Sequence, residues 1–223
     1  MGKRRRKYRS SKPAAGKPAV LREIASSTAA AAAAMVVFGT GEVALALPQG
    51  MSVRGGQLSI QQVNGTTTLI KQGSKRAAAD FKGFDIHSGE RVRIDQPNKK
   101  STFLGRVTSG RITEIHGRLD ANGRVLLINP AGVLVGPGGV VNTAAFTATT
   151  LQADPEQFMR GGAVQLKALP GDPADAAVIN QGTINTADGG FAALVAPHVV
   201  NNGVINARLG QVQMASGTAA TVD

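Results

Sequence analysis

One short pattern recurs at a fixed offset near the end of this 223-residue chain. Asn180-Gln-Gly-Thr-Ile-Asn185 lies over Asn201-Asn-Gly-Val-Ile-Asn206, so that Asn, Gly, Ile and Asn coincide at an offset of 21 residues. With one residue skipped, the match continues from 190–196 onto 210–216, and an earlier copy occupies 116–130. Each copy has a short strand, a turn rich in Asn, Asp and Gly, and a second strand. A period of about 20 residues without helix-length apolar patterns is typical of a coil whose turns stack on one another.

The repeat therefore predicts an all-β fold, a parallel β-helix, in which strands of successive turns pair about 4.8 Å apart. Inward side chains then stack on their equivalents in the next turn, and we expect this of Ile179, Ile184, Leu194, Ile205, Val212 and Met214. A β-sandwich is the alternative, because its strands also recur every 8 to 12 residues. Hairpins, however, need no motif at one fixed offset. Outside the leader, helix is expected only near 154–159, where acidic residues accompany a proline.

The composition fits a narrow coil. The chain has 28 Gly, one Tyr and no Trp, so small side chains must fill its interior. It has no Cys, which excludes a disulfide framework, Cys-ligated zinc, iron–sulfur clusters and thiol catalysis. We expect no cofactor.

The first 46 residues have the three-part layout of a secretory signal. Residues 1–22 are basic and free of acids, Ala29–Phe38 is an unbroken apolar run, and Ala44-Leu45-Ala46 offers small residues at the spacing that signal peptidase recognises. The apolar run is shorter than the roughly 20 residues that span a bilayer. We expect cleavage after Ala46 and a single domain over residues 47–223.

The same segment explains most of the net charge of +11. Alternatives for its basic residues are a nucleic-acid patch, a localisation signal or an organellar transit peptide. None of these explains the apolar run that precedes Ala-Leu-Ala, so no nucleic-acid partner is expected.

Two later segments carry a family resemblance. The first is Asp95-Gln96-Pro97-Asn98 followed by Phe103–Thr108, and the second is Gly117–Gly136, which includes Asn129-Pro130-Ala131-Gly132. In this order, behind a long leader, they resemble the N-terminal secretion domain of two-partner-secretion exoproteins, the filamentous haemagglutinin and high-molecular-weight adhesin family. The resemblance runs from about Pro48 to the end of the chain.

The resemblance implies a right-handed β-helix with an N-terminal cap and a role as an export address in a Gram-negative bacterium. In that family the domain crosses the periplasm, is recognised by the POTRA modules of a dedicated outer-membrane barrel, and emerges at the cell surface or in the medium. Host-cell glycans or receptors are contacted through C-terminal regions, where adhesin, haemolysin or toxin activities reside. The pattern is still running at Asp223, which fits either a fragment of a longer exoprotein or a short stand-alone product.

The family typically has Asn where this chain has Ala131. Ala cannot bond the turn through its side chain, so we expect a looser turn or weaker recognition there. Pro130 still fixes φ and Gly132 still permits a left-handed corner. The two motifs, Asp95 to Asn98 and Asn129 to Gly132, are our candidates for the elements that shape the recognised surface.

Parallel β-helices also include polysaccharide-cleaving enzymes, so a secreted carbohydrate-active enzyme is the alternative function. His87, His116 and His198 are scattered and have no metal-ligand spacing. Glu114, His116 and Asp120 are close in sequence and could form an acid/base group, but Asp120 is expected in a turn. We expect neither a catalytic nor a metal site.

Five basic residues within a short stretch predict a weakly positive rim, either a solvated face or a contact for an acidic barrel interior or anionic glycans. They are Arg91, Arg93, Lys99, Lys100 and Arg106.

Overall fold

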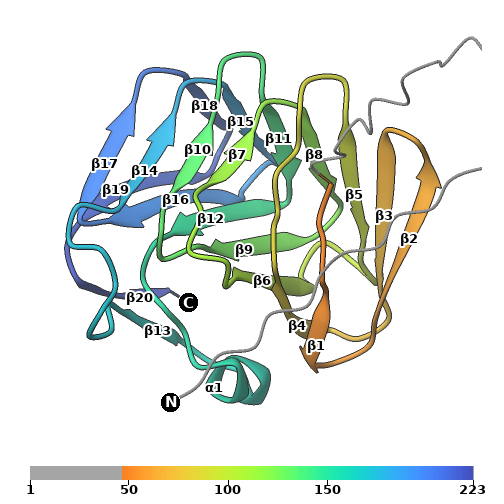
Figure 1. Ribbon diagram of the computed structural model, residues 1–223, viewed down its shortest axis with the longest axis horizontal. Coiled ribbons are helices and arrows are strands. Elements are labelled where there is room, and N and C mark those ends of the chain that lie inside the picture. Colours follow the sequence, from red (N-terminus) through yellow and green to blue (C-terminus); the bar gives the residue numbers. More distant parts are fainter. Residues whose placement is uncertain (1–46, 223) are drawn as a thin grey trace, which may run out of the picture. The chain divides into compact units, whose positions relative to one another are not determined.

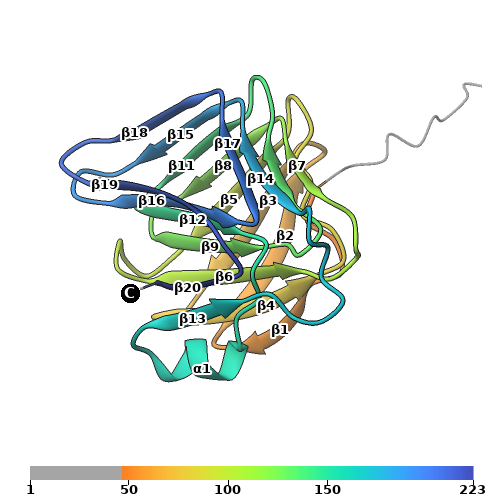
Figure 2. The same cartoon turned by 90° about the vertical axis from the view of Figure 1, so that its left-hand side faces the viewer.

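The computed structural model of the chain describes residues 47–222. Strands account for nearly all regular structure in this part, and they wind into successive turns of a parallel β-helix (Figure 1). Seen along the coil, three sheets form its walls, here called sheets 1, 2 and 3 (Figure 2). The predicted β-helix is confirmed, and the sandwich alternative is excluded because consecutive strands within a turn belong to different sheets.

Sheet 1 contains seven strands in the order β1-β4-β6-β9-β12-β16-β19. They are β1 (Ser52–Gly55), β4 (Arg76–Phe81), β6 (Thr102–Val107), β9 (Arg124–Ile128), β12 (Ala145–Thr149), β16 (Phe191–Ala196) and β19 (Gln211–Ser216). All neighbours from β4 to β19 pair in parallel.

Sheets 2 and 3 complete each turn. Sheet 2 has the order β18-β15-β11-β8-β5-β3-β2, and sheet 3 has the order β17-β14-β10-β7. The strands of sheet 2 are β2 (Leu58–Asn64), β3 (Thr67–Gln72), β5 (Arg91–Asp95), β8 (Arg118–Ala121), β11 (Val140–Thr143), β15 (Thr183–Thr186) and β18 (Val204–Ala207). Those of sheet 3 are β7 (Thr113–Ile115), β10 (Val133–Val135), β14 (Ala177–Asn180) and β17 (His198–Asn201). Neighbours pair in parallel everywhere except β2 with β3.

The sequence repeat corresponds to the register of the coil. Asn180 pairs with Asn201, Ile184 with Ile205, and Leu194 with Met214. The alignment of the two copies skips one residue between 180–185 and 190–196, and this residue lies at the corner between sheets 2 and 1. The earlier copy is also in register, because Leu119 and Ile184 both pair with Val141 on the intervening strand.

Two antiparallel strands cap the beginning of the coil. β1 pairs antiparallel with β4, and β2 pairs antiparallel with β3, so both parallel sheets of the first turn have their outer edges covered. Unpaired strand edges recruit other strands, and a change of direction at the edge strand ends the parallel stack. This is the predicted N-terminal cap.

Aliphatic and phenyl side chains fill the interior. Phe81 packs edge-to-face on Phe84 with ring centroids 5.1 Å apart, and on Phe103 at 6.2 Å. Ile184 and Leu194 face inward as expected and are fully buried, whereas Val212 and Met214 continue inward columns but remain about half exposed in the last described turn.

The expected inward position of Ile179 is wrong. Its neighbours Val178 and Asn180 are buried inside the coil, and Ile179 lies half-buried on the outer face of sheet 3. Asn180 can occupy the interior because its side chain bonds the next turn. Its Nδ2 donates to Asn201 Oδ1 at 2.7 Å, and its Oδ1 accepts the Gly182 N–H at 3.2 Å.

The glycine of the repeated motif allows adjacent turns to approach closely. Gly117, Gly139, Gly182 and Gly203 stack at the corner between sheets 3 and 2, and a Cβ on any of them would overlap a backbone carbonyl oxygen of the preceding turn. None of these four has a positive φ. They are therefore required by contact between turns, and not by a left-handed backbone.

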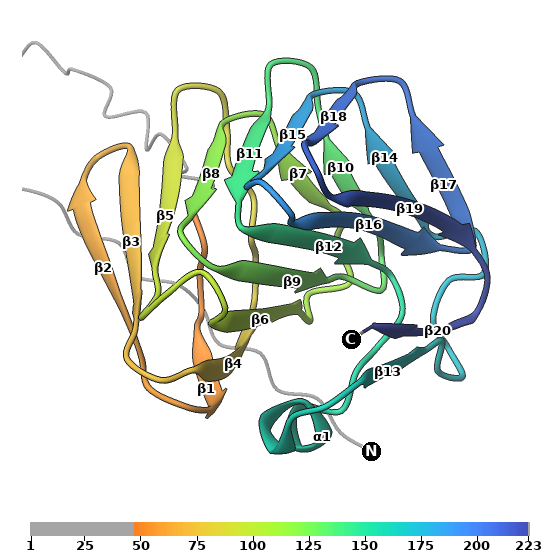
Figure 3. The same ribbon diagram turned by 180° about the vertical axis from the view of Figure 1, so that it is seen from behind.

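A separate layer covers the outer face of sheet 1. The segment between β12 and β14 carries α1 (Pro155–Arg160) and β13 (Val164–Lys167), and β13 pairs antiparallel with β20 (Ala219–Val222) (Figure 3). The helix begins where it was expected, with Asp154 Oδ1 accepting the Glu156 N–H at 2.9 Å. Phe158 and Leu166 bury a second apolar cluster against this face. No helix among the described residues is long and apolar enough to cross a membrane.

Candidate functional site

The motif Asp95-Gln96-Pro97-Asn98 forms the corner between β5 and β6. Asp95 ends β5, Gln96 turns inward and is 6% exposed, and Pro97 and Asn98 lie at the surface. Asn98 closes the turn, because its Oδ1 accepts the Lys100 N–H at 2.9 Å and its carbonyl accepts the Ser101 N–H at 3.0 Å.

Gln96 connects this corner to the turns on both sides. Its Nε2 donates to Gln72 Oε1 at 3.2 Å, to the Ser101 carbonyl at 3.0 Å and to the Arg124 carbonyl at 3.2 Å. Asn122, at the next corner, forms a reciprocal pair with the Gln96 backbone, with both bonds at 2.7 Å. The buried amide thus joins three turns of the coil.

The motif Asn129-Pro130-Ala131-Gly132 forms the corner between β9 and β10. Asn129 is 1% exposed, and its Nδ2 donates to the Arg111 carbonyl at 2.8 Å and to Thr113 Oγ1 at 2.9 Å. Its Oδ1 accepts the Ala131 N–H at 3.0 Å, and its carbonyl accepts the Gly132 N–H at 3.0 Å. The buried Asn129 side chain therefore closes the β-turn at its own corner and also bonds to the preceding turn of the coil.

Ala131 and Gly132 contribute through the backbone. The turn is closed by the Asn129 side chain and by main-chain groups, so it forms without a polar side chain at position 131. Gly132 has a φ of +132°, and a Cβ there would lie 3.1 Å from the Ala177 carbonyl and 3.2 Å from Ile112 Cγ2. Gly132 is the residue that this corner requires.

The two motifs do not form one patch. The first joins sheet 2 to sheet 1, and the second joins sheet 1 to sheet 3, so they occupy different corners of the coil (Figure 2). The corner at which a motif lies depends on how its strands align with those of the neighbouring turns. The sequences of the two motifs do not contain that information.

A shallow apolar groove of 260 Å³ adjoins the second motif. Its lining includes Ala131 and Gly132 of the motif, Pro173 and Asp175 of a later loop, and Leu134 and Ile179 of sheet 3. Ile112 also lines it and is 46% exposed. This groove was not predicted from the sequence, because Ile179 was expected to face the interior.

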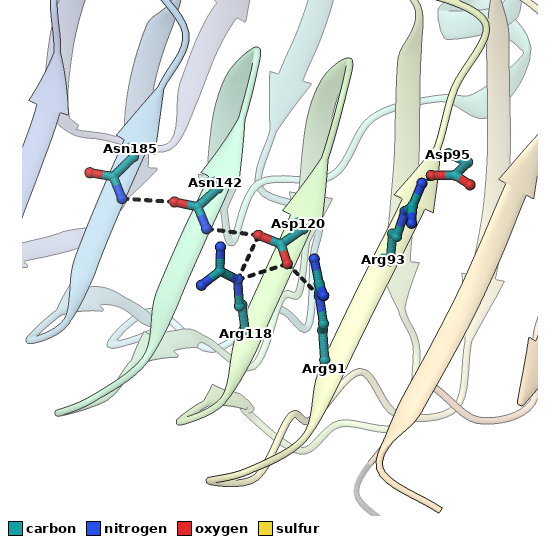
Figure 4. A network of polar contacts seen from close by, with 7 residues as sticks. All are labelled: Arg91, Arg93, Asp95, Arg118, Asp120, Asn142 and Asn185. Atoms are coloured by element: carbon teal, nitrogen blue, oxygen red, sulfur yellow. Dashed lines mark hydrogen bonds and ion pairs between the residues drawn. The ribbon is translucent and has the colours of Figure 1, made fainter. Parts of the chain in front are cut away.

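A polar ladder runs along the outer face of sheet 2 (Figure 4). Asn206 Nδ2 donates to Asn185 Oδ1, Asn185 Nδ2 to Asn142 Oδ1, and Asn142 Nδ2 to Asp120 Oδ1, at 2.8, 2.8 and 2.7 Å. Stacked amides of this kind are the side-chain ladders that cross-β stacking favours. The ladder ends at Asp120 because a carboxylate accepts and does not donate.

Asp120 is held as an anion. Partial burial pushes the pKa of Asp120 up, but hydrogen bonds from Arg118, Asn142 and Arg91 outweigh it and hold this pKa below its usual value. Asp120 lies in strand β8, so the expected turn position is wrong; the turn begins at Asn122. An ionised carboxylate bound by two arginines cannot act as a general acid.

The candidate acid/base group does not assemble. Glu114 and His116 share one face, with His116 Nε2 3.5 Å from Glu114 Oε2, whereas Asp120 is bound to its partners on sheet 2. His87 and His198 are exposed. Among residues 47–222, no group of His, Cys, Asp or Glu side chains is arranged to hold a metal ion.

The five basic residues expected to form a positive rim do not form one continuous patch, because three of them are paired with carboxylates. Arg91 binds Asp120, Arg93 binds Asp95 at 2.7 Å, and Arg106 binds Asp80 at 2.8 Å on a different sheet. Lys99 and Lys100 remain exposed at the first motif. The expected cleavage residues Ala44 and Ala46 lie outside the described residues.

Comparisons with known proteins agree with this geometry. A family model described as the TPS secretion domain matches residues 25–223. Two curated heme/hemopexin-binding proteins from Haemophilus influenzae are 40% identical over 95 residues and 35% identical over 178 residues. These matches cover 43% and 77% of this chain but only 10% and 19% of those proteins, so the chain spans a fifth or less of their length.

A solved structure is similar along most of the chain. The crystal structure of the HMW1 secretion domain from Haemophilus influenzae is 35% identical and superposes with a TM-score of 0.73. The match covers 79% of this chain and 46% of that one. The matched family is one of secretion domains of exoproteins and not a family of enzymes.

Proposed function

Because the chain belongs to the TPS secretion domain family, we propose that its β-helix is the export address of an adhesin-like two-partner exoprotein. Its partner is a dedicated outer-membrane barrel whose POTRA modules recognise the domain in the periplasm of a Gram-negative bacterium. Residues 1–46 are the signal that takes the chain across the inner membrane, with cleavage after Ala46. Leu47, the residue that follows, is 3% exposed and packs into the core, so it belongs to the folded domain.

The capped first turn is the observation that carries the proposal. Antiparallel β1 and β2 close one end of the stack, so turns add in chain order from that end. A repeat coil can nucleate at one place and propagate to its neighbours. At about 25 cal/mol per Å² of apolar surface, each added turn that buries a few hundred Å² favours further emergence of the chain without nucleotide hydrolysis.

The two corner motifs shape the recognised surface by fixing the backbone. The Asn129 corner is the stronger candidate, because its side chain is fully engaged internally and the adjoining apolar groove is open to a partner. Exposed apolar surface bordered by polar residues is characteristic of interaction sites. The POTRA modules are the partner that we assign to this groove.

Secretion of a double variant tests the role of the corner. We expect Asn129→Ala with Gly132→Ala to abolish export from cells that carry the transporter. The matched control is Asn64→Ala with Gly65→Ala, at the exposed turn of the cap, where Asn64 Oδ1 also accepts a backbone N–H, from Thr66 at 3.0 Å. Undiminished export of the corner variant contradicts a special role for this motif.

Binding measurements separate recognition from folding. Leu134→Ser and Ile112→Ser change the groove and leave the four residues of the motif in place, so both folded variants should bind the purified POTRA modules less tightly than the parent protein. Val63→Ser is the control, because Val63 is 54% exposed in the cap hairpin. Equal affinities for all three variants would exclude the groove as the binding site of the POTRA modules.

Mass spectrometry of the exported protein tests the expected cleavage after Ala46. An intact N-terminus beginning at Met1 would exclude this cleavage.

A further inference from the structure

An open groove crosses the outer face of sheet 2. It has a volume of 660 Å³, and its lining includes residues of four neighbouring strands, β5, β8, β11 and β15. Neighbouring strands lie about 4.8 Å apart, so the groove extends roughly 14 Å along the axis of the coil. A second hollow of 510 Å³ adjoins it, because Asp95 and Gln96 line both. The two hollows, together called the sheet 2 groove, border the first motif and share no residue with the apolar groove that we assigned to the POTRA modules.

Three members of the polar ladder, Asp120, Asn142 and Asn185, line the sheet 2 groove. The bonds of the ladder use one N–H and one carbonyl lone pair of each of the two amides and so fix the orientation of the amide planes (Figure 4). A primary amide has two N–H groups and two lone pairs. Each amide therefore keeps one donor and one acceptor that have no partner among residues 47–222. Because their orientation is already fixed, these groups lose little freedom when a ligand binds.

The sheet 2 groove has more basic than acidic residues. Arg91 donates through Nε to Asp120 at 2.6 Å, and Arg93 donates through Nε to Asp95 at 2.7 Å. The Nη groups of both exposed arginines have no partner among residues 47–222, so they are available to a ligand. The basic residues that line the groove are Lys71, Arg91, Arg93 and Lys99, and its carboxylates are those of Asp95 and Asp120.

We propose that the sheet 2 groove binds an acidic oligosaccharide, a linear chain of sugars that carry carboxylates. Sugar hydroxyls both donate and accept hydrogen bonds, so they match the free N–H and the free lone pair of each amide. Carboxylates of the sugars accept from the free Nη groups of the arginines and from the lysines. In an extended chain, sugar units repeat at a distance close to the spacing of neighbouring strands. Successive units therefore meet successive rows of the ladder.

The same lining disfavours other classes of ligand. A peptide that binds by adding a strand needs a free sheet edge, whereas β5, β8, β11 and β15 are each paired on both sides. Single-stranded nucleic acid stacks its bases on aromatic side chains, and no aromatic residue of the described chain lines the groove. Apolar small molecules bind in enclosed and mostly apolar cavities, whereas this groove is open and lined mainly by polar residues.

Titration of the purified protein with hexagalacturonate, followed by NMR of the side-chain amide signals, tests the proposal. We expect saturable shifts of the Asn142 and Asn185 signals with a dissociation constant of about 0.1–1 mM, which rises with salt concentration. The methyl-esterified hexasaccharide has the same hydroxyls and no charge, so it should bind at least about tenfold more weakly.

Variants locate the binding site. Arg93→Gln removes one exposed guanidinium and should weaken binding at least about fivefold, and Asn185→Ala removes one amide and should act in the same direction. Arg93→Lys keeps the charge without the planar fork and should lie between Arg93→Gln and the parent. Lys167→Ala is the control, because it removes one exposed positive charge from β13, outside the groove, and should bind as the parent does.

Each outcome supports or overturns the proposal. Saturable shifts that need the carboxylates of the ligand and are weakened by Arg93→Gln support it. The absence of saturable shifts, or equal affinities for the acid and its methyl ester, overturns it. An equal loss in Arg93→Gln and Lys167→Ala shows attraction to the overall charge of the protein and also overturns it. The measurement needs no transporter, so its failure leaves the proposed export role untouched.

Discussion

One buried carboxylate adds a charged contact between the cap and the coil, and removal of its charge should destabilise the protein in a pH-dependent way. Asp80 in β4 is 5% exposed. It accepts from Arg54 Nε of the cap strand β1 at 2.6 Å, and from Arg106 Nε and Nη2 of β6 at 2.8 and 2.9 Å. Asp80→Asn keeps the shape of the side chain and removes its charge.

The magnitude follows from this geometry. A hydrogen bond to a charged group contributes about 1.5–3 kcal/mol, and removing one partner of a buried ion pair costs about 3–5 kcal/mol. Because Arg54 is about half exposed and the contributions are not additive, we expect Asp80→Asn to lower the free energy of unfolding by about 2–4 kcal/mol at pH 7. With a urea m-value of about 2 kcal/mol per M, the midpoint falls by roughly 1–2 M.

The pH dependence is specific to this mechanism. Burial pushes the pKa of Asp80 up, but hydrogen bonds from Arg106 and Arg54 outweigh it, so the folded-state pKa lies below its ordinary value. A carboxylate with a lowered folded-state pKa stabilises the protein above its unfolded pKa of about 3.9, and this contribution is lost as the pH falls through the folded-state pKa. The difference between parent and variant should therefore be full at pH 7 and pH 5 and shrink below about pH 4.

Urea unfolding monitored by circular dichroism at pH 7, 5 and 3 measures this difference. Asp188→Asn is the control, because Asp188 pairs with Arg208 at an exposed site and its loss should leave the midpoint unchanged. Equal midpoints for parent and Asp80→Asn at pH 7 would refute the clamp. A gap of the same size at pH 3 would refute its electrostatic origin.

Three further substitutions test the interior, the corner and the ladder. Phe146→Ala, at a fully buried position inside the coil, should cost about 3–5 kcal/mol of unfolding free energy in urea titrations, whereas Val63→Ala in the cap should change it by less than about 0.5 kcal/mol. Gly132→Ala should cost about 1–3 kcal/mol, measured in the same way, because it places a side chain at a φ of +132°; no loss would show that the corner can relax. Asn142→Ala interrupts the ladder between Asp120 and Asn185 and should cost about 1 kcal/mol and increase hydrogen exchange in β11; unchanged exchange would show that the ladder adds nothing.

The sequence was sufficient to predict the coil, because its signals are local and repeated. The motif at an offset of 21 residues became strand register, with Asn180 over Asn201 and Ile184 over Ile205. The helix start at Asp154 and the turn at Asn129 were also predictable, since capping and turn formation depend on residues adjacent in sequence.

The sequence did not reveal in the same way which side chains face the interior, or which segments pack against each other. β4 is buried on both faces, so Ala77 and Ala78 show no alternation between apolar and polar residues. Ile179 was assigned inward because it is aliphatic, yet the buried Asn180 takes that side by bonding the next turn. The layer over sheet 1 depends on contacts such as Arg76 with Phe158, 82 residues apart, which no local pattern contains.

Export in the presence and absence of the transporter tests the central claim most directly. The protein should be quantified in the medium and at the surface of cells that express it with, and without, a POTRA-bearing outer-membrane barrel encoded beside it. The account predicts that the chain leaves the cell only when that barrel is present and accumulates in the periplasm otherwise. Equal amounts outside the cell in both strains would contradict it.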